Sequence, residues 1–448
     1  MSETGPLSQA VFARNARVIA GGAVSLNRLV EPRIAFRRGR GARIWDVDGR
    51  EYVDYHGAFG PHILGHNDPD INAAVVAVLQ QETSLFGSGT TEMEGELAEL
   101  LVAAVPSMER VQLTNSGSEA TYHALRIARA HTGREHIVVI QGGYNGWHNE
   151  VAVNLMTPLE ELGPRVSPGE YPLVPLSAGI PHGVFDRVHA VNFNDAPSVE
   201  YVLRRHPVAA VLLEPVLQNI GVLPPQPGYL EELRALCTRH GTILIFDEVK
   251  TGFRAAFGGY QSVCGVRPDL TVLGKAVANG FPLAVIGGRA DLMACFHATE
   301  PQQRVMIAGT YNGHPVSVAA AIATLRKLRA GGDPMYHTMA AHTQALAAGL
   351  CAQAAEFSLP CVVSTCGSAF CQYFMDHVPV DWHDLARHHD FALDTAFRRA
   401  LIELGVYHFP VHCKQGSVSA AHTAEHVQWT VDCFGAALRS VRASRGAP

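Results

Sequence analysis

Six short apolar segments between residues 111 and 290 most constrain the fold of this 448-residue chain. Helical periodicity separates them, and strands that are apolar throughout are typical of a parallel sheet buried on both faces. Ligands bind such sheets beyond the carboxyl ends of the strands. The expected strands are Val111–Leu113, His136–Ile140, Val208–Leu213, Ile243–Phe246, Leu270–Leu273 and Ala284–Ile286.

The rest of the chain predicts an α/β protein with a second, smaller α+β domain. Residues 71–314 are expected to form the large domain, residues 315–448 the small domain, and residues 1–70 a segment that joins the small domain. The proline- and glycine-rich stretch 156–188 predicts a long loop, a lid or a disordered insert. Helices are also expected at 118–132, 316–329, 337–356 and 385–404, and a strand at 367–374.

Two polar residues follow two of the apolar segments. Lys275, one of only four lysines, comes after Leu273-Gly274, and Asp247 comes directly after Phe246. A pyridoxal phosphate (PLP) site requires a lysine for the Schiff base and an acid that holds the protonated ring nitrogen. The lysine must be partly desolvated to act as nucleophile and base. Each residue alone fits a strand-end lysine or a helix-capping aspartate, but together they predict a PLP site.

Two glycine-containing motifs fit the same site. The turn Ser116-Gly117-Ser118 opens a predicted helix, so its N–H groups, hydroxyls and helix dipole suit a phosphate, although the motif alone is more typical of an ordinary serine cap. In Gly142–His148, glycines allow close backbone approach, and Tyr144 is placed to stack on a flat ring. A surface tyrosine on a glycine loop is the alternative.

Bulk composition excludes several classes of partner. A net charge of −6 implies no basic face for nucleic acid. No apolar stretch approaches the roughly 18 residues that cross a membrane, and the N-terminus lacks the pattern of a signal peptide. Nine cysteines, an odd number without a Cys-x-x-Cys pair, suit reduced thiols. We therefore expect a soluble cytoplasmic protein.

Histidines are numerous, at 23, but predict no metal site. The densest group lacks a cysteine partner and a His-x-x-x-His pair on an apolar face, so a solvated helix face is expected there. That group is His383, His388 and His389, among Asp381, Asp384 and Asp390.

Further motifs complete a family pattern. They are Trp45–Gly49, Gly65-His66, Asn115–Ala120, Phe246–Val249 with Thr251–Arg254, Gly274-Lys275 and Gly309–Gly313. Over about residues 12–435 the chain resembles the class III PLP-dependent aminotransferases of fold type I, most closely the branch that contains glutamate-1-semialdehyde 2,1-aminomutase. The resemblance implies a mostly parallel seven-stranded sheet between helices. It also implies a small domain built from N- and C-terminal segments, and a homodimer with shared active sites.

The resemblance also implies roles for individual residues. Lys275 carries the Schiff base and later shuttles the proton, Asp247 pairs with the ring nitrogen, and Tyr144 covers the ring face. Asn219 lies near the ring hydroxyl. The phosphate contacts are Ser116, Gly117 and Ser118, with Thr310 reaching the phosphate of the other subunit.

The implied substrate contacts are Ser25, Arg28, Phe59 and Lys414. Arg28 would meet a substrate carboxylate through its planar fork, with a surface arginine as the alternative. Phe59 corresponds to an aromatic residue of the mutase. Lys414 stands where the mutase has an active-site glutamate, which reverses the charge offered to the substrate. Asn145 is a second departure, since the family often has histidine after the ring-covering tyrosine.

These features predict a PLP-dependent aminotransferase that moves an amino group from an amino acid or amine donor to a carbonyl acceptor by a ping-pong mechanism. Its partners are expected to be these small molecules. The nearest alternative is intramolecular transfer of the aminomutase type. A racemase or 2-epimerase follows, because the same carbanion can be reprotonated from the opposite face. A Schiff-base enzyme without PLP and an inactive scaffold are other classes, which a lack of visible absorption would identify.

Overall fold

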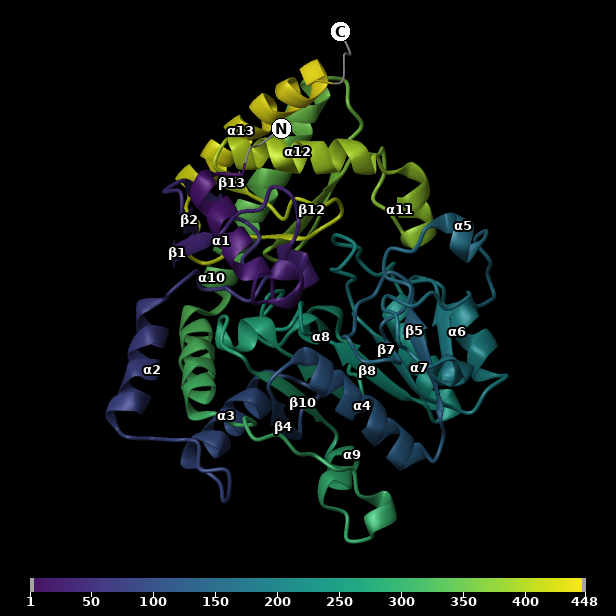
Figure 1. The fold of residues 1–448 in the computed structure, drawn as a ribbon. Coiled ribbons are helices and arrows are strands. Elements are labelled where there is room, and N and C mark those ends of the chain that lie inside the picture. The colour runs from purple at the N-terminus through teal and green to yellow at the C-terminus, as the bar shows by residue number, and fades with distance from the viewer. Residues whose placement is uncertain (1–3, 445–448) are drawn as a thin grey trace. The chain divides into compact units, whose positions relative to one another are not determined.

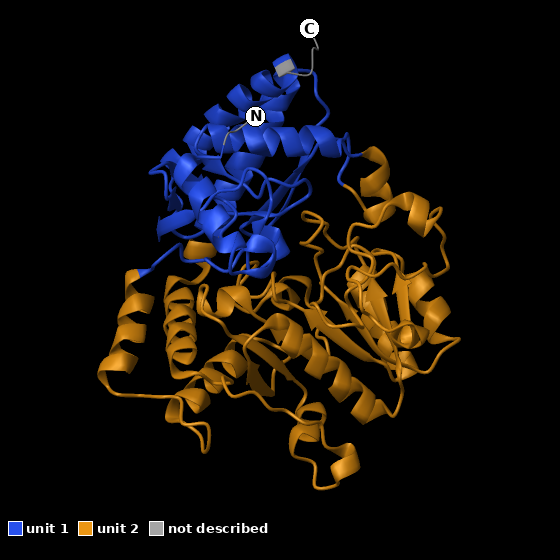
Figure 2. Cartoon of the chain, viewed as in Figure 1, with its two compact units in different colours: residues 1–68, 337–378, 389–448 blue, residues 69–336, 379–388 orange. Residues whose placement is uncertain are grey.

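The structure is a computed structural model that describes residues 4–444, and the chain divides into two compact units (Figure 2). Unit 1 contains the residues up to 68, residues 337–378 and the residues from 389 onward, while unit 2 contains residues 69–336 and 379–388. The N-terminal and C-terminal segments thus fall in one unit. The unit boundaries at 68 and 336 differ from the domain boundaries expected at 70 and 314.

Unit 2 is built on a seven-stranded, mostly parallel sheet, which confirms the predicted fold class (Figure 1). The strand order is β4-β10-β9-β8-β7-β5-β6, and only β10 runs antiparallel to its neighbours. Every residue of β7, β8, β9 and β10 is buried, as the continuous apolar runs predict. The strands are β4 (Arg110–Thr114), β5 (His136–Ile140), β6 (Val188–Val191), β7 (Val208–Leu213), β8 (Ile243–Asp247), β9 (Leu270–Leu273) and β10 (Ala284–Gly288).

Helices pack on this sheet, and Figure 1 shows α4 (Gly117–Thr132) lying across its strands. This helix begins at the Ser116 cap and ends at Gly133, which adopts the left-handed conformation at φ 65° that glycine accepts most readily. The other helices are α2 (Pro69–Gln80), α3 (Glu92–Ala104), α5 (Leu159–Leu162), α6 (Ala196–Leu203), α7 (Tyr229–His240), α8 (Tyr260–Cys264), α9 (Ala290–Met293) and α11 (Trp382–His388). The 3-10 turns are η3 (His182–Arg187), η4 (Lys275–Ala278), η5 (Ala294–His297) and η6 (Pro301–Gln303).

Unit 1 is the smaller α+β unit. It holds a sheet of order β1-β2-β3-β13 and a sheet of order β11-β12-β14. Their strands are β1 (Phe36–Arg40), β2 (Arg43–Asp46), β3 (Glu51–Asp54), β11 (Val362–Cys366), β12 (Ala369–Tyr373), β13 (Val406–Tyr407) and β14 (Gly416–Ser417). The helices are α1 (Pro6–Ala16), α12 (Phe391–Glu403) and α13 (Ala424–Ser444), with 3-10 turns η1 (Ala20–Gly22) and η2 (Leu26–Arg28).

One helical element, α10 (Pro315–Glu356), contributes residues to both units. It is interrupted at Gly332, whose backbone is not helical at φ 50° and ψ −157°, just before Pro334. The interruption agrees with the two helices expected from the sequence, because proline cannot continue a helix. Within residues 4–444, no helix combines the length and the apolar character needed to cross a bilayer.

The proline-rich stretch 156–188 is anchored to the rest of unit 2. Arg165 Nε donates to Asp381 Oδ2 at 2.7 Å, and the aspartate is fully buried. Tyr171 is also buried, and its hydroxyl accepts from the Val166 N–H and donates to the Val166 carbonyl. This loop therefore has fixed contacts of its own.

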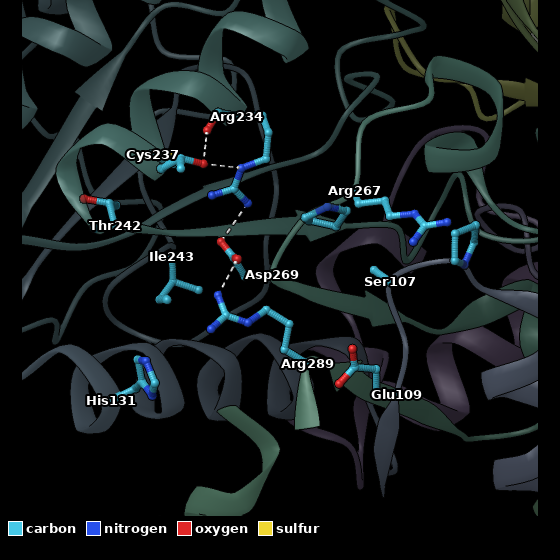
Figure 3. Close-up of a pocket in the computed structure, with 14 residues that line it drawn as sticks. Ser107, Glu109, His131, Arg234, Cys237, Thr242, Ile243, Arg267, Asp269 and Arg289 are labelled. Carbon is cyan, nitrogen blue, oxygen red and sulfur yellow. Dashed lines mark hydrogen bonds and ion pairs between the residues drawn. The ribbon is translucent and has the colours of Figure 1, made fainter. Parts of the chain in front are cut away.

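At the amino ends of β8 and β9, two arginines converge on one buried carboxylate (Figure 3). Asp269 accepts from Arg234 at 2.8 Å, from Arg289 at 3.0 Å and from the Leu244 N–H at 2.8 Å. The arginines line a pocket of about 500 Å³. Because the bond to Leu244 ties the start of β9 to β8, it fixes how the opposite ends of these strands align.

Candidate active site

Asp247 is the last residue of β8 and is buried at the carboxyl edge of the sheet. Its Oδ2 accepts from Asn145 Nδ2 at 2.8 Å, and its Oδ1 accepts from the Val249 N–H at 3.0 Å. Burial, followed by the charge of Glu214, raises the pKa of Asp247 to about 7, against the lowering effect of these hydrogen bonds. Without a cation beside it, the ionised form of Asp247 is therefore unfavourable.

Glu214 organises the neighbouring strand end. It follows β7, is buried, and accepts from Asn219 Nδ2 at 2.8 Å and from the Gln218 N–H at 3.0 Å. It also accepts from the Tyr144 N–H at 2.9 Å. One carboxylate thus binds two residues that the sequence assigned to the site, Tyr144 and Asn219. Glu214 is not among the residues that the sequence assigned to the site.

Lys275 lies just beyond the carboxyl end of β9, the strand next to β8. Its backbone is in the left-handed region, at φ +47°, which is strained for a residue other than glycine. Burial lowers the pKa of Lys275, against the opposing charges of Asp247 and Glu214. An amine with a lowered pKa can act as nucleophile and base near neutral pH.

The Ser116–Ser118 turn forms the N-terminus of α4. Ser116 Oγ accepts from the Glu119 N–H at 3.3 Å, and Glu119 Oε2 accepts from the Ser116 N–H at 2.8 Å, so the two residues form a capping box. Ser118 Oγ accepts from the Trp147 N–H at 3.2 Å. A Cβ at Gly117 would lie 2.9 Å from Val249 Cγ2, so glycine allows the turn to approach the segment after Asp247.

Thr310 is exposed in the single chain. The turn that carries it is linked to the same region, because Asn115 Nδ2 donates to Asn312 Oδ1 at 2.9 Å. Asn115 directly precedes the Ser116–Ser118 turn. The reach of Thr310 to a second subunit stays a prediction.

These residues fit the cofactor expected from the sequence. A protonated ring nitrogen beside Asp247 would offset the cost of the buried charge, and Lys275 supplies a deprotonatable amine at the adjacent strand end. The helix N-terminus at Ser116–Ser118 suits a phosphate. Asn145, which the sequence did not assign to the site, completes this set by donating to Asp247. Its position after Tyr144 was the only signal for it.

The expected substrate contacts all belong to unit 1. Arg28 and Phe59 line one cavity of about 680 Å³, and Ser25 and Lys414 do not line it among the described residues. Ser25 and Arg28 are exposed, and Lys414 is half-buried. Phe59, at φ +69°, contacts Phe409 with ring centroids 5.0 Å apart. Their roles towards a substrate stay predictions.

The expectation of a solvated histidine face is wrong for two of three residues. His383 is buried, with Nε2 3.1 Å from the Gly163 carbonyl oxygen. His389 is buried too, and its Nδ1 accepts from the Phe374 N–H at 3.0 Å. Only His388 is exposed. A polar run along the sequence does not reveal that an imidazole satisfies a buried backbone group.

Comparisons with known proteins agree with this geometry. The family profile of class-III aminotransferases matches residues 26–436. A glutamate-1-semialdehyde 2,1-aminomutase of Bordetella avium is 39% identical over 440 residues, covering 97% of this chain and 99% of the relative. The solved omega-transaminase from Sphaerobacter thermophilus has a TM-score of 0.90 and 34% identity, covering 98% of each chain. A glutamate-1-semialdehyde aminomutase from Pseudomonas aeruginosa PAO1 has a TM-score of 0.85 and 27% identity, covering 97% of this chain and 95% of the other.

Proposed function

This chain belongs to the class-III aminotransferase family, and on that premise we propose that it transfers an amino group from an amino acid or amine donor to a carbonyl acceptor in two half-reactions. Its cofactor is pyridoxal 5'-phosphate. One observation carries the proposal. Asp247 ends β8, and Lys275 lies just beyond the end of the adjacent parallel strand β9. After burial, which raises the pKa of Asp247 and lowers that of Lys275, the negative charge of Glu214 acts to raise the pKa of both groups.

The bound cofactor supplies an electron-withdrawing ring that stabilises negative charge on the carbon bearing the amino group. The chain must keep that ring protonated, which is the role we assign to Asp247. Asn145 and the Val249 N–H favour the ionised carboxylate through hydrogen bonds at 2.8 and 3.0 Å. Together with a protonated ring nitrogen, these bonds would favour the ionised form of Asp247 although it is buried.

Lys275 is the proposed base. Burial lowers the pKa of its amine and so favours the neutral form, in which Nζ can accept the proton from the substrate carbon and return it. The proposed phosphate donors are Ser116, Gly117 and Ser118. We assign the ring face to Tyr144 and the ring hydroxyl to Asn219, since Glu214 holds both near Asp247.

We further propose that the enzyme is a homodimer in which Thr310 completes the partner's phosphate site. The exposure of Thr310 in the single chain supports this assignment, because an exposed hydroxyl is accessible to a second copy. A cytoplasmic location is also proposed, and nine cysteines that form no disulfide among the described residues suit a reducing compartment.

A second candidate function is the aminomutase reaction, in which donor and acceptor carbons belong to one molecule. It is favoured by the relatives, since those from Bordetella avium and Nitrosospira multiformis, at 39% and 38% identity, are named glutamate-1-semialdehyde 2,1-aminomutase. Lys414 argues against it, because the family resemblance implies that the mutase has an acid where this chain has a cation. The two functions differ in whether a separate acceptor is required.

The test is turnover of the purified holoenzyme with a panel of amino donors, each with and without pyruvate or 2-oxoglutarate. An aminotransferase forms a new amino acid only when donor and acceptor are both present. A mutase converts glutamate 1-semialdehyde without any acceptor. Lys275→Ala serves as the blank. If neither reaction exceeds this blank, the proposed function is wrong.

A further inference from the structure

Three histidines from distant parts of the sequence meet at one end of the sheet of unit 2. His136 opens β5, His189 is the second residue of β6, and His206 lies between α6 and β7. Their ligand atoms all lie within 4.8 Å of one another. The group lies near the edge of the sheet where β7, β5 and β6 are neighbours.

Strand register brings the first two rings together. His189 pairs with Val138 across the parallel strands, and Val138 lies two residues beyond His136. Side chains two residues apart on a strand share a face, so His136 and His189 lie on the same face of the sheet. His206 approaches from the start of the neighbouring strand, since His136 pairs with Val208.

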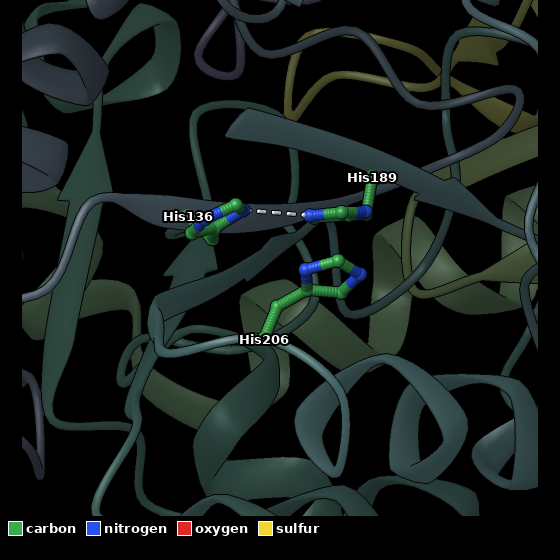
Figure 4. A group of neighbouring side chains, drawn as sticks. All are labelled: His136, His189 and His206. Carbon is green, nitrogen blue, oxygen red and sulfur yellow. Dashed lines mark hydrogen bonds between the residues drawn. The ribbon is translucent and has the colours of Figure 1, made fainter. Parts of the chain in front are cut away.

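The distances are close to those of a metal centre. His136 Nδ1 and His189 Nε2 are 3.0 Å apart, and Figure 4 shows a nitrogen of His206 directed towards this pair. Imidazole nitrogens at the usual 2.0–2.1 Å from a tetrahedral zinc ion lie about 3.4 Å from each other. A hydrogen bond joins the two rings in the structure, and a small separation of the rings would admit a cation in its place.

A carboxylate behind one ring completes the pattern of a metal site. Glu170 Oε2 lies 2.6 Å from His189 Nδ1, so this nitrogen donates to the carboxylate and Nε2 is left to face the other rings. A carboxylate on the outer nitrogen of a histidine ligand fixes its tautomer and raises its basicity. His189 is buried, whereas His136 and His206 are half-buried, which leaves a path for an ion and a water ligand.

Charged groups beside the cluster also bear on the binding of a cation. Arg187 forms an ion pair with Glu135 beside the cluster. The negative charge of Glu170 is then available to offset that of a cation.

We propose that His136, His189 and His206 form a structural binding site for a borderline divalent cation of the zinc class, with Glu170 orienting His189. Three imidazoles suit zinc, copper or nickel rather than magnesium or calcium. The site lies at the amino ends of the strands, whereas Lys275 and Asp247 follow carboxyl ends, so the ion would tie β5, β6 and the start of β7 together without entering the chemistry.

The experiment uses tag-free holoenzyme, equilibrated with Zn²⁺ and dialysed, with metal content measured by elemental analysis and affinity by chelator competition. The wild type should retain one equivalent per chain. His206→Gln and His189→Gln should lose that equivalent, and Glu170→Gln should weaken binding about 10–100-fold. Zn²⁺ should raise the Tm of the wild type and leave that of His206→Gln unchanged.

His182→Gln is the matched control, because this exposed histidine lies in the same part of the chain and outside the cluster. It should bind Zn²⁺ as the wild type does. His206 is half-buried, so its variant keeps the test valid if His189→Gln fails to fold. Retention of a full equivalent by both His206→Gln and His136→Gln would assign the zinc to other histidines and overturn the proposal. Wild-type enzyme that retains no zinc would overturn it as well.

Discussion

Replacing Asp247 by asparagine should stabilise the cofactor-free protein while weakening the holoenzyme. The two effects have opposite signs because the buried carboxylate is costly without a cation beside it. Asparagine never ionises but still accepts from the Val249 N–H, and rotation of the Asn145 amide would restore the second hydrogen bond. The variant therefore removes the charge with little change in shape.

The magnitude follows from the raised pKa. Asp247 titrates near 7 in the folded protein against 3.8 as a model carboxyl. The folded state therefore holds the proton more tightly between these values, so stability falls as pH rises from about 4 to about 7 and the loss is complete above that. A pKa difference of about three units corresponds to a loss of about 4 kcal/mol in the free energy of unfolding at pH 8, of which roughly 2 kcal/mol is already lost at pH 5.

The assay is calorimetry of cofactor-free wild type and Asp247→Asn at pH 5 and pH 8. The Tm of the variant should exceed that of the wild type by more at pH 8 than at pH 5, in line with a further stability difference of about 2–3 kcal/mol. Cofactor affinity should fall about 10–100-fold, since a hydrogen bond to a charged group is lost. Asp195→Asn, at a buried aspartate whose carboxylate caps α6, is the control for replacement of a buried aspartate outside the site. A Tm difference between Asp247→Asn and wild type that is the same at both pH values would show that this carboxylate is not penalised by burial.

Three further substitutions test single assignments. Lys275→Ala should lose turnover by several orders of magnitude in steady-state assays yet retain the cofactor on ultrafiltration, and near-normal turnover would move the assignment to Lys250. Thr310→Ala should raise the cofactor dissociation constant about tenfold in a fluorescence titration, and an active wild-type monomer in analytical ultracentrifugation would contradict the shared site. Lys414→Glu should raise the KM of acidic donors more than that of neutral donors, and equal effects on both would show that Lys414 does not sense substrate charge.

The fold was predictable because buried strands are continuously apolar in the sequence. The apolar run Val208–Leu213 is buried at every position, and the Gly332–Pro334 interruption lies where two helices were expected to meet. The direction of β10 was not predictable, since an apolar run looks the same in either orientation. β6 was missed because His189 interrupts its apolar pattern.

The candidate site was predictable only where a side chain of suitable chemistry stands at the end of an apolar strand, as Lys275 and Asp247 do. The hydrogen bond from Asn145 to Asp247 joins residues 102 positions apart, so no local pattern reveals it. The histidine cluster was missed for the same reason: His136 and His189 are 53 positions apart, and sheet register alone brings them together.

Through its hydrogen bond to the neighbouring strand, Asp269 also influences where Lys275 lies. It secures the start of a strand of four residues, about 13 Å long, whose far end carries Lys275. A slip of one residue would send the lysine to the opposite face of the sheet. Substitution of Arg234 or Arg289 is therefore expected to lower activity, although neither side chain lies at the carboxyl ends of the strands. Side chains at the opposite edge of the sheet can thus matter to the proposed site through strand register alone.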